Sequence, residues 1–263
     1  MKFRNLALIV SLSSISITIM GVTKKHGKIN KTHPALSFVE KRLVGIENIS
    51  SPASNGKFEY DEVGRLVSVD WNETRTEYKY QHDTLLSSTW NKDRAKKTEF
   101  IRGDFSEQGY LGEYERWYIL SGDTTKTSGR FEYNEEGMLE MQAISFKKGD
   151  EWQKFYEYVQ ENLVAIRTFK NSKPVSVTTY EYTDKPDMLK MDFSRFYDAA
   201  YNITGPSNKN LPSGKLIVNP KGKVLYDAKY TYEFDNSGYI VSRTTTSADN
   251  MFEPTTEKFA YNK

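Results

Sequence analysis

A nine-residue pattern recurs along the chain and constrains its fold more than any other feature. The three best copies are FEYDEVGRL at 58–66, FEYNEEGML at 131–139 and YEFDNSGYI at 232–240. Each copy reads aromatic, Glu, aromatic, Asp or Asn, two variable positions, Gly, one variable position and Leu or Ile. Self-similarity of this kind is the signature of a repeat architecture, so one supersecondary unit is expected to recur through the chain.

The pattern has the chemistry of a β-hairpin connection. Its two aromatic residues fall on the same face of a strand, because side chains alternate with a period of two. Asp or Asn at the fourth position can hydrogen-bond forward to the main chain and open a turn. Gly three residues later supplies the left-handed backbone that such turns often need. The aliphatic residue at the ninth position then begins the returning strand.

Weaker copies fill the intervals between the strong ones. They lie at 78–86, 103–111, 156–164 and 216–224, and the strand half alone is present at 180–182 and 259–261. In the copy at 156–164, Asn162 occupies the glycine position, and Asn tolerates a left-handed backbone next best. From 58 to 180, successive copies start 20 to 28 residues apart, which is the length of one up-and-down pair of strands with its turns.

The predicted fold is therefore all-β, an antiparallel up-and-down meander that forms a barrel or a strongly curled sheet. The first strand is expected at 42–47. Apolar and polar residues alternate in the segments 66–71, 74–80, 111–119, 139–146 and 175–182. Alternation of this kind is typical of a sheet with one buried and one solvated face.

One insertion interrupts the meander. Residues 188–203 carry apolar side chains at helical spacing and predict one short amphipathic helix. A loop at 205–212 follows, and strands are expected to resume at Leu216. We interpret the helix–loop insertion, 188–212, as a lid that closes one end of the sheet or barrel, or as a gate over a ligand cavity.

The N-terminal residues predict export. Lys2 and Arg4 precede an uncharged, largely apolar stretch, as in a secretory signal peptide. The chain is divided into a signal peptide at 1–21, a tether at 22–40 and a single β-repeat domain at 41–263, located in the periplasm or at the cell surface. An uncleaved membrane anchor is the alternative, because the 19 residues from 5 to 23 are uncharged. Val22 stands where a lipoprotein carries its essential cysteine, so lipidation is not predicted.

Charge and residue types exclude several classes of function. Without residues 1–21 the chain has 35 basic and 35 acidic residues, a balance that does not suit a sequence-independent nucleic-acid binder. There is no cysteine, and the only histidines are His26, His33 and His82. A disulfide, a multi-histidine metal site and a Ser-His-Asp triad are therefore not expected. No nucleotide-binding motif is present, and we predict no cofactor, no metal and no catalytic residue.

Aromatic side chains are the leading candidates for binding. They are the four tryptophans and two residues of the predicted helix: Trp71, Trp90, Trp117, Trp152, Phe196 and Tyr197. Exposed on one face, the tryptophans would form a platform on which sugars stack. Packing in the core is the alternative for each.

Carboxylates are the second group of candidates. Glu113, Glu115 and Asp192 are of the type that a paired-carboxylate glycosidase uses, with solvated strand charges or a helix cap as the alternative. Asp184, Asp187 and Asp192 offer oxygen atoms to calcium, but their spacing matches no calcium loop, and turn or cap roles are favoured.

The repeat also carries a resemblance to known families. The segment YDEVGRL at 60–66 resembles the YD repeat of Rhs-type shell proteins. The chain is more closely similar to a family of exported proteins of Gram-negative bacteria that have a domain of unknown function with a porin-like fold. That resemblance rests on RLVGI at 42–46, YTDKP at 182–186 with SNKNLP at 207–212, and the copy at 232–240, and it covers residues 40–263. It implies a meandering antiparallel barrel in the envelope, often lipid-anchored, and it assigns no catalytic residue.

Polar side chains argue against a membrane-spanning form of such a barrel. A membrane barrel carries an outward apolar band about 25 Å tall, whereas many outward positions here are Glu, Lys, Thr or Ser and the mean hydropathy is −0.69. We therefore expect a soluble porin-like barrel that does not span the membrane once the signal is removed, and that is a monomer.

The sequence leaves three functions open. The leading hypothesis is a non-enzymatic exported protein of the envelope that binds a ligand or acts structurally. The second is a carbohydrate-active hydrolase with paired carboxylates in an aromatic cleft. The third is a carrier of an apolar small molecule, which needs a continuous apolar cavity. A glycan and an apolar small molecule are the candidate ligands.

Overall fold

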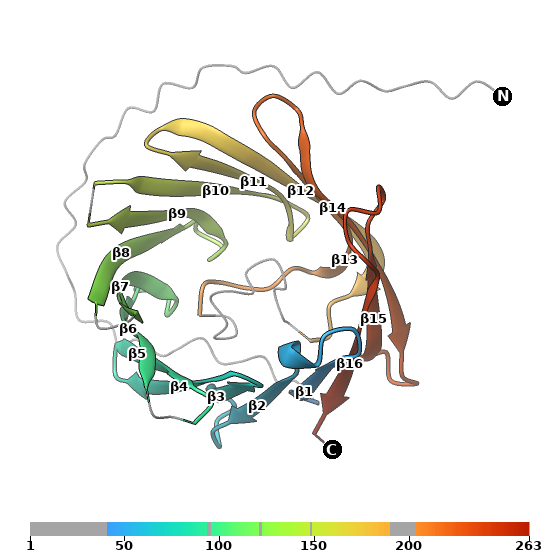
Figure 1. Ribbon diagram of the computed structural model, residues 1–263, viewed down its shortest axis with the longest axis horizontal. Coiled ribbons are helices and arrows are strands. Elements are labelled where there is room, and N and C mark those ends of the chain that lie inside the picture. Colours follow the sequence, from blue (N-terminus) through green and yellow to red (C-terminus); the bar gives the residue numbers. More distant parts are fainter. Residues whose placement is uncertain (1–40, 94–95, 121–122, 148, 190–202, 263) are drawn as a thin grey trace. The chain divides into compact units, whose positions relative to one another are not determined.

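The structure is a computed structural model that describes residues 41–93, 96–120, 123–147, 149–189 and 203–262. These residues form sixteen β-strands and one turn of 3-10 helix, η1 (Pro52–Ser54), as Figure 1 shows. The strands are β1 (Leu43–Asn48), β2 (Gly56–Tyr60), β3 (Leu66–Trp71), β4 (Thr74–Gln81), β5 (Thr84–Asn91), β6 (Lys97–Phe105), β7 (Leu111–Leu120), β8 (Asp123–Tyr133), β9 (Leu139–Phe146), β10 (Glu151–Val159), β11 (Asn162–Lys170), β12 (Lys173–Pro186), β13 (Asn210–Val218), β14 (Val224–Phe234), β15 (Ile240–Thr246) and β16 (Thr255–Tyr261).

Each strand pairs antiparallel with its neighbours in the sequence, and β1 pairs with β16 to close the barrel. The predicted all-β, up-and-down meander is therefore confirmed. Of the two forms expected, the closed barrel is the one observed. Among the described residues, no helix has the length and apolar character needed to cross a membrane.

Strand β13 begins earlier than predicted. The sequence places a loop at 205–212 and the next strand from Leu216, whereas β13 starts at Asn210. Pro212 lies opposite Tyr182 where the register shifts, and such irregularities admit a residue that has no N–H to donate. The predicted signal peptide (1–21), the tether (22–40) and residues 190–202 of the predicted helix lie outside the described residues.

The recurring pattern forms turns as its chemistry predicts. In the first copy, Asp61 Oδ1 accepts a hydrogen bond from the Arg65 N–H at 2.8 Å, and Gly64 has φ +88°. The glycines of the other two strong copies have φ +81° and +85°. The ninth residue of each strong copy is the first residue of β3, β9 or β15.

The weaker copy at 156–164 forms a different turn from the one predicted. Asn162 does not occupy a left-handed position but is the first residue of β11. The left-handed residues are Gln160 (φ +50°) and Glu161 (φ +64°). A two-residue hairpin loop of type I′ needs both central residues in that region, so the left-handed positions are 160 and 161 rather than 162.

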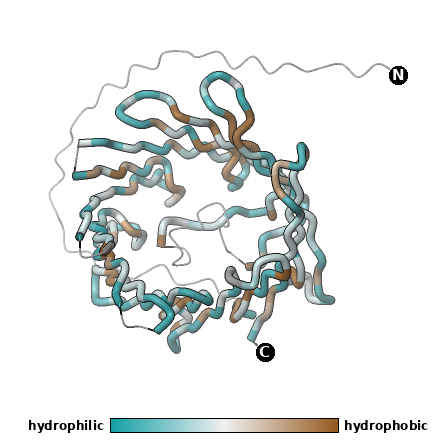
Figure 2. The backbone as a smooth tube through the Cα atoms, viewed as in Figure 1, coloured by the Kyte–Doolittle hydropathy of each residue, from teal (hydrophilic) through white to brown (hydrophobic). Residues whose placement is uncertain are grey.

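The two faces of the wall differ, and residues 203–209 identify the inner one. These residues lie inside the ring of strands (Figure 1). Ile203 packs against a buried cluster made of Leu111, Tyr114, Phe131 and Leu139, so the face that carries this cluster is the inner face. Figure 2 shows hydrophobic and hydrophilic residues alternating along many strands, as a two-faced wall requires.

Tyrosine hydroxyls on the inner face form hydrogen bonds that join neighbouring strands in pairs. In each case a tyrosine near the end of one strand donates to a main-chain carbonyl near the start of the preceding strand. Among the described residues, six such bonds of 2.6–3.0 Å join Tyr60 to Leu43, Tyr80 to Leu66, Tyr133 to Leu111, Tyr182 to Leu163, Tyr232 to Pro212 and Tyr261 to Ile240. Five of these tyrosines are the third residue of their copy of the pattern, and Tyr232 is the first residue of its copy. Each packs through its ring and satisfies a carbonyl through its hydroxyl.

The described ends of the insertion are hydrogen-bonded to the wall and to each other. The Leu111 N–H donates to the Ile203 carbonyl at 2.6 Å, and the Leu163 N–H donates to Asn208 Oδ1 at 2.8 Å. The Asp187 N–H donates to the Lys209 carbonyl at 2.9 Å, which brings the two ends together. The insertion therefore reaches β7 and β11 at the barrel end where the pattern's turns lie.

Candidate binding groove on the outer wall

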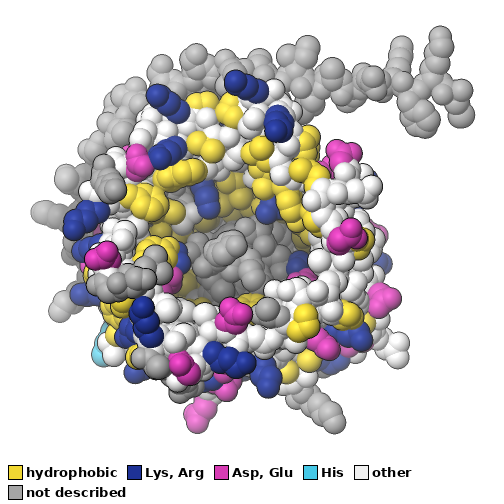
Figure 3. All heavy atoms as spheres, in the orientation of Figure 1, with side chains coloured by type: hydrophobic (Ala, Val, Ile, Leu, Met, Phe, Trp, Pro, Cys, Tyr) yellow, Lys and Arg dark blue, Asp and Glu magenta, His cyan; other side chains and the backbone are white. Residues whose placement is uncertain are grey.

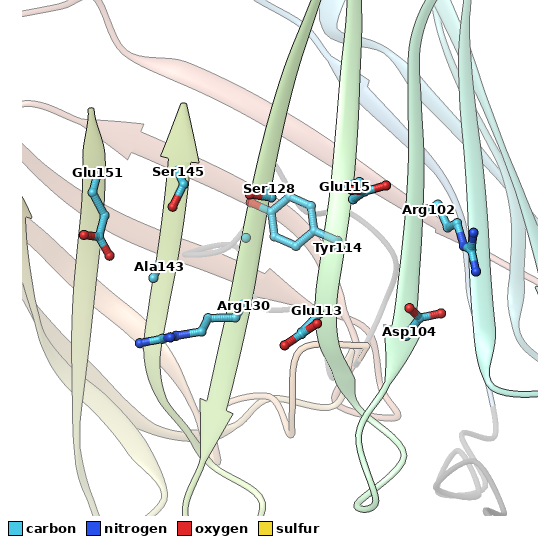
Figure 4. A pocket seen from close by; sticks show the side chains of 11 residues that line it. Arg102, Asp104, Glu113, Tyr114, Glu115, Ser128, Arg130, Ala143, Ser145 and Glu151 are labelled. Atoms are coloured by element: carbon cyan, nitrogen blue, oxygen red, sulfur yellow. The ribbon is translucent and has the colours of Figure 1, made fainter. Parts of the chain in front are cut away.

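A polar groove of about 470 Å³ lies against the strands β6 to β10. Figure 4 shows its side chains on neighbouring strands. The lining residues are Arg102, Asp104, Glu113, Tyr114, Glu115, Ser128, Gly129, Arg130, Ala143, Ser145 and Glu151. We call this feature the outer groove.

Strand register places most of the lining on the outer face. Tyr114 belongs to the inner cluster, so its sequence neighbours Glu113 and Glu115 point the other way. Two rows of cross-strand partners then run side by side on that outer face. One row is Arg102, Glu115, Ser128, Ser145 and Glu151, and the other is Asp104, Glu113, Arg130 and Ala143.

Two glycines lie on the inner side of the same strands. Gly103 and Gly129 flank Tyr114 in the register. A Cβ on Gly129 would overlap the Tyr114 ring, and one on Gly103 would overlap Leu111. Glycine in a strand interior commonly marks a bend or a close approach. The inner space at these two positions is taken by the Tyr114 ring and by Leu111.

The groove carries four carboxylates and two guanidinium groups, and only part of this charge is paired. Glu115 forms an ion pair with Lys126 at 2.5 Å, and Asp104 Oδ1 accepts a hydrogen bond from the Thr84 hydroxyl at 3.1 Å. Within the described part of the chain, neither Glu113 nor Arg102 has an ion-pair partner, and both are exposed. An acceptor and a donor are therefore available to a ligand.

A row of aromatic rings borders the groove on the same outer face. Phe100 and Trp117 are cross-strand partners. On this face of β6 and β7 they are the residues next to Arg102 and Glu115, two positions along each strand. Their ring centroids are 5.3 Å apart. Lys97 lies over the rings of both Trp90 and Phe100, at 4.8 and 5.3 Å. We call Trp90, Phe100 and Trp117 the aromatic row.

The structure separates the four tryptophans that the sequence nominates. Trp90 and Trp117 are half-buried on the outer face, two strands apart. Trp71 lies on the inner face, where its ring meets Phe58 edge-on at 5.9 Å. Trp152 is also inward by register, with the Lys170 ammonium 5.9 Å from its ring. Phe196 and Tyr197 lie outside the described residues, and a binding role for any of the six stays a prediction.

Sequence reasoning missed Phe100 and the groove itself. The candidate carboxylates Glu113 and Glu115 do lie in the groove. One signal for the arrangement was present, because Glu113, Glu115 and Trp117 alternate along one strand and must share a face. The other four strands also contribute residues to the groove, and no pattern in the sequence indicates that those residues meet there.

The remaining carboxylate candidates do not assemble in the described residues. Asp187 is only 2 % exposed, and its Oδ1 accepts a hydrogen bond from the Leu189 N–H at 3.0 Å, which is the turn role expected for it. Asp192 lies outside the described residues. No group of three or more His, Cys, Asp or Glu residues within the described ranges is placed to hold a metal ion.

Comparison with known proteins supports the fold. No protein-family model matches the chain, and no curated protein matches it. A porin-like protein from Bacteroides uniformis has a solved structure that aligns with a TM-score of 0.65 and 16 % identity, over 88 % of this chain and 100 % of that one. A porin-like protein from Bacteroides vulgatus aligns with a TM-score of 0.60 and 14 % identity, over 84 % and 99 %. This chain therefore has the barrel fold of these porin-like proteins.

Proposed function

We propose that this protein is a non-enzymatic binding barrel that holds a carbohydrate across the outer groove and the aromatic row. The observation that carries the proposal is that the two features are neighbours in the strand register. Phe100 and Trp117 stand beside Arg102 and Glu115 on the same face of the same two strands.

Sugars present two kinds of surface, and this part of the wall offers a partner for each. Their C–H faces pack against aromatic rings, which supply large apolar area with little loss of side-chain entropy. Their hydroxyls need fixed donors and acceptors, and Arg102, Glu113, Ser128 and Ser145 provide both kinds within one groove. The excess of carboxylates over guanidinium groups favours a neutral or amino sugar over a polyanion.

The same proposal includes export to the cell envelope. Its support is the signal-like pattern of residues 1–21 and the porin-like fold. The outer wall suits contact with water rather than lipid. Arg75, Glu77 and Lys79 project outward in succession from β4, and Asp227 and Lys229 do so from β14, where a lipid-facing band would be apolar.

Direct binding measurements test the carbohydrate assignment. The purified chain is run through native gels that contain soluble xyloglucan, mixed-linkage glucan or chitosan, and bound polysaccharides are followed by calorimetry with their hexasaccharides. We expect retardation by at least one polysaccharide. Trp117→Ala is expected to weaken binding about tenfold or more, since burial of a large apolar side chain contributes about 1.5–3 kcal/mol.

Phe234→Ala is the matched control, because it removes a 37 % exposed aromatic ring from β14, away from the groove. It should leave affinity within twofold of the wild type. An equal loss in both variants, or no binding to any of the three polysaccharides, contradicts the assignment. If shortened oligosaccharide is recovered after long incubation, and Glu113→Gln abolishes its formation, the protein is a hydrolase and not a non-enzymatic binding protein.

A further inference from the structure

The outer groove is longer across the strands than along them. Figure 4 shows its side chains in two rows that cross neighbouring strands. The first row has one residue on each of the strands β6 to β10, from Arg102 on β6 to Glu151 on β10. Adjacent strands lie about 4.8 Å apart, so this row runs about 19 Å across the wall. The second row lies two residues away along each strand, which is about 7 Å. A ligand that fills the groove is therefore elongated and crosses the strands.

Hydrogen-bonding side chains recur at every strand step of the first row. Arg102 offers donors, and the hydroxyls of Ser128 and Ser145 can both donate and accept. The two serines are cross-strand partners on β8 and β9, and both are exposed. Within the described ranges, no side-chain hydrogen bond engages either serine hydroxyl. These groups are therefore available to a ligand.

The two carboxylates of the first row are only partly engaged by the protein. Glu115 on β7 is paired with Lys126, and Glu151 accepts a hydrogen bond from the Gln153 amide at 3.1 Å. A carboxylate has two oxygen atoms and about four lone-pair directions, so one partner leaves room for a hydroxyl of a ligand. Each of the five strands thus offers a ligand at least one polar contact.

The two ends of the first row differ in their apolar surroundings. Phe100 and Trp117 border the row on β6 and β7. At the other end β10 begins at Glu151, so no strand residue continues the aromatic border there. A bound chain is therefore held by stacking and hydrogen bonds at the β6–β7 end, and by hydrogen bonds alone at the β10 end.

Charge does not select the ligand by sign. Figure 3 looks down the barrel and shows Lys and Arg side chains mixed with Asp and Glu around the ring. In the groove the same mixing continues, because Arg130 of the second row is the cross-strand partner of Glu113 and also pairs with Glu132 at 3.2 Å. Shape and spacing of polar groups therefore decide what fits.

We propose that the outer groove binds a linear, β-1,4-linked chain of about four sugars that lies across the strands. An extended chain of this linkage advances by roughly one strand spacing per sugar, so successive sugars meet successive side chains of the first row. The sugar beside Trp117 is the anchor, and the sugar at the far end contacts Ser145 and Glu151. This inference rests on the carbohydrate function proposed above and adds the linkage, length and direction of the ligand.

A length series on the unmodified full-length chain tests the proposal. Calorimetry measures the dissociation constants of cellobiose, cellotetraose and cellohexaose, and of β-1,4-linked glucosamine oligosaccharides of the same lengths. Weak disaccharides are measured by displacement of the bound hexasaccharide. In at least one series we expect the tetrasaccharide to bind at least tenfold more tightly than the disaccharide, and the hexasaccharide to bind within threefold of the tetrasaccharide. Maltotetraose, whose α-linked chain curls, should bind at least tenfold more weakly than the better of the two β-linked tetrasaccharides.

Substitutions at the two ends of the groove test the direction of the chain. Trp117→Ala removes the anchoring ring and should weaken binding of every length by a similar factor. Glu151→Ala removes the acceptor at the far end, so it should weaken the tetrasaccharide at least fivefold and leave the disaccharide within twofold. Glu233→Ala is the matched control, because it removes an exposed carboxylate from the outer face of β14 and should leave every affinity within twofold.

The outcomes separate this inference from the function on which it rests. Absence of binding at every length contradicts the carbohydrate function itself. Equal affinity for the disaccharide and the hexasaccharide, equal affinity for maltotetraose, or a loss in Glu151→Ala that is the same at all lengths overturns the inference and leaves the carbohydrate function standing. The length series needs no variant, so it decides the matter even if Glu151→Ala does not give the wild-type circular dichroism spectrum.

Discussion

The tyrosine–carbonyl bonds allow a direct test of what holds the strand pairs together. Tyr182→Phe deletes one hydroxyl and leaves the ring in place. In the wild type that hydroxyl donates to the Leu163 carbonyl at 2.7 Å. Leu163 is 0 % exposed and sits in a cluster with Ile166 and Tyr180, so water does not readily reach the abandoned carbonyl.

The magnitude follows from that burial. An intramolecular hydrogen bond contributes a net of about 1 kcal/mol, and a buried acceptor left without a donor costs about 1–3 kcal/mol. We expect Tyr182→Phe to lower the free energy of unfolding by about 1–2 kcal/mol. For a domain of this size that corresponds to a fall in Tm of about 2–8 °C.

Urea unfolding followed by tryptophan fluorescence, with a thermal melt by circular dichroism, measures the effect. Tyr226→Phe is the matched control, because its hydroxyl bonds to another hydroxyl rather than to a main-chain carbonyl. It should shift the urea midpoint much less. An unchanged midpoint in Tyr182→Phe, or equal shifts in the two variants, would refute the view that these bonds stabilise the barrel.

Two further perturbations probe the wall and one turn. Gly129→Ala places a methyl group against the Tyr114 ring and should destabilise the barrel by about 1–3 kcal/mol in urea unfolding; the cost should shrink in a Tyr114→Leu background, and an undiminished cost there would contradict the contact. Asp235→Asn keeps the turn's side-chain acceptor, as Asn134 does in its own turn, but removes the charge that faces Lys41. The Lys41 side chain and the Tyr239 N–H lower the pKa of Asp235 below its usual 3.8, so it stabilises the fold above about pH 3.8 and this contribution is lost as the pH falls further. The difference between the urea midpoints of the two proteins should therefore be steady from pH 7 to pH 5 and shrink as the pH falls below about 3.8, and a constant difference at low pH would count against the pair.

Local chemistry made the turns and strand boundaries predictable. Asp61, Gly64 and Leu66 have the roles that their types and spacing indicate, because an Asx turn, a left-handed residue and a strand start each depend on a few neighbouring atoms. The turn before Asn162 shows where this reasoning ends. Its two-residue loop is imposed by the pairing of β10 with β11.

The candidate site depends on contacts that no local pattern contains. Period-two alternation assigns residues to two faces, but it does not say which face is inner, and each register shift resets it. Trp90 follows such a shift and faces outward, whereas Trp71 faces inward against Phe58. The register shift puts these two tryptophans on opposite faces of the sheet, and closure of the sheet decides which face is the inner one.

The amino-acid pattern alone indicates that this chain is a meander of paired strands and that several pairs are joined by Asx–glycine turns. The physical reason is that each turn and strand is specified within about nine residues, at the length scale of a side chain and its own backbone. Barrel closure and the outer groove are decided by contacts between strands that lie apart in the sequence. The outer groove joins five strands from a segment of about 50 residues, so it depends on the pairing and register of β6 to β10.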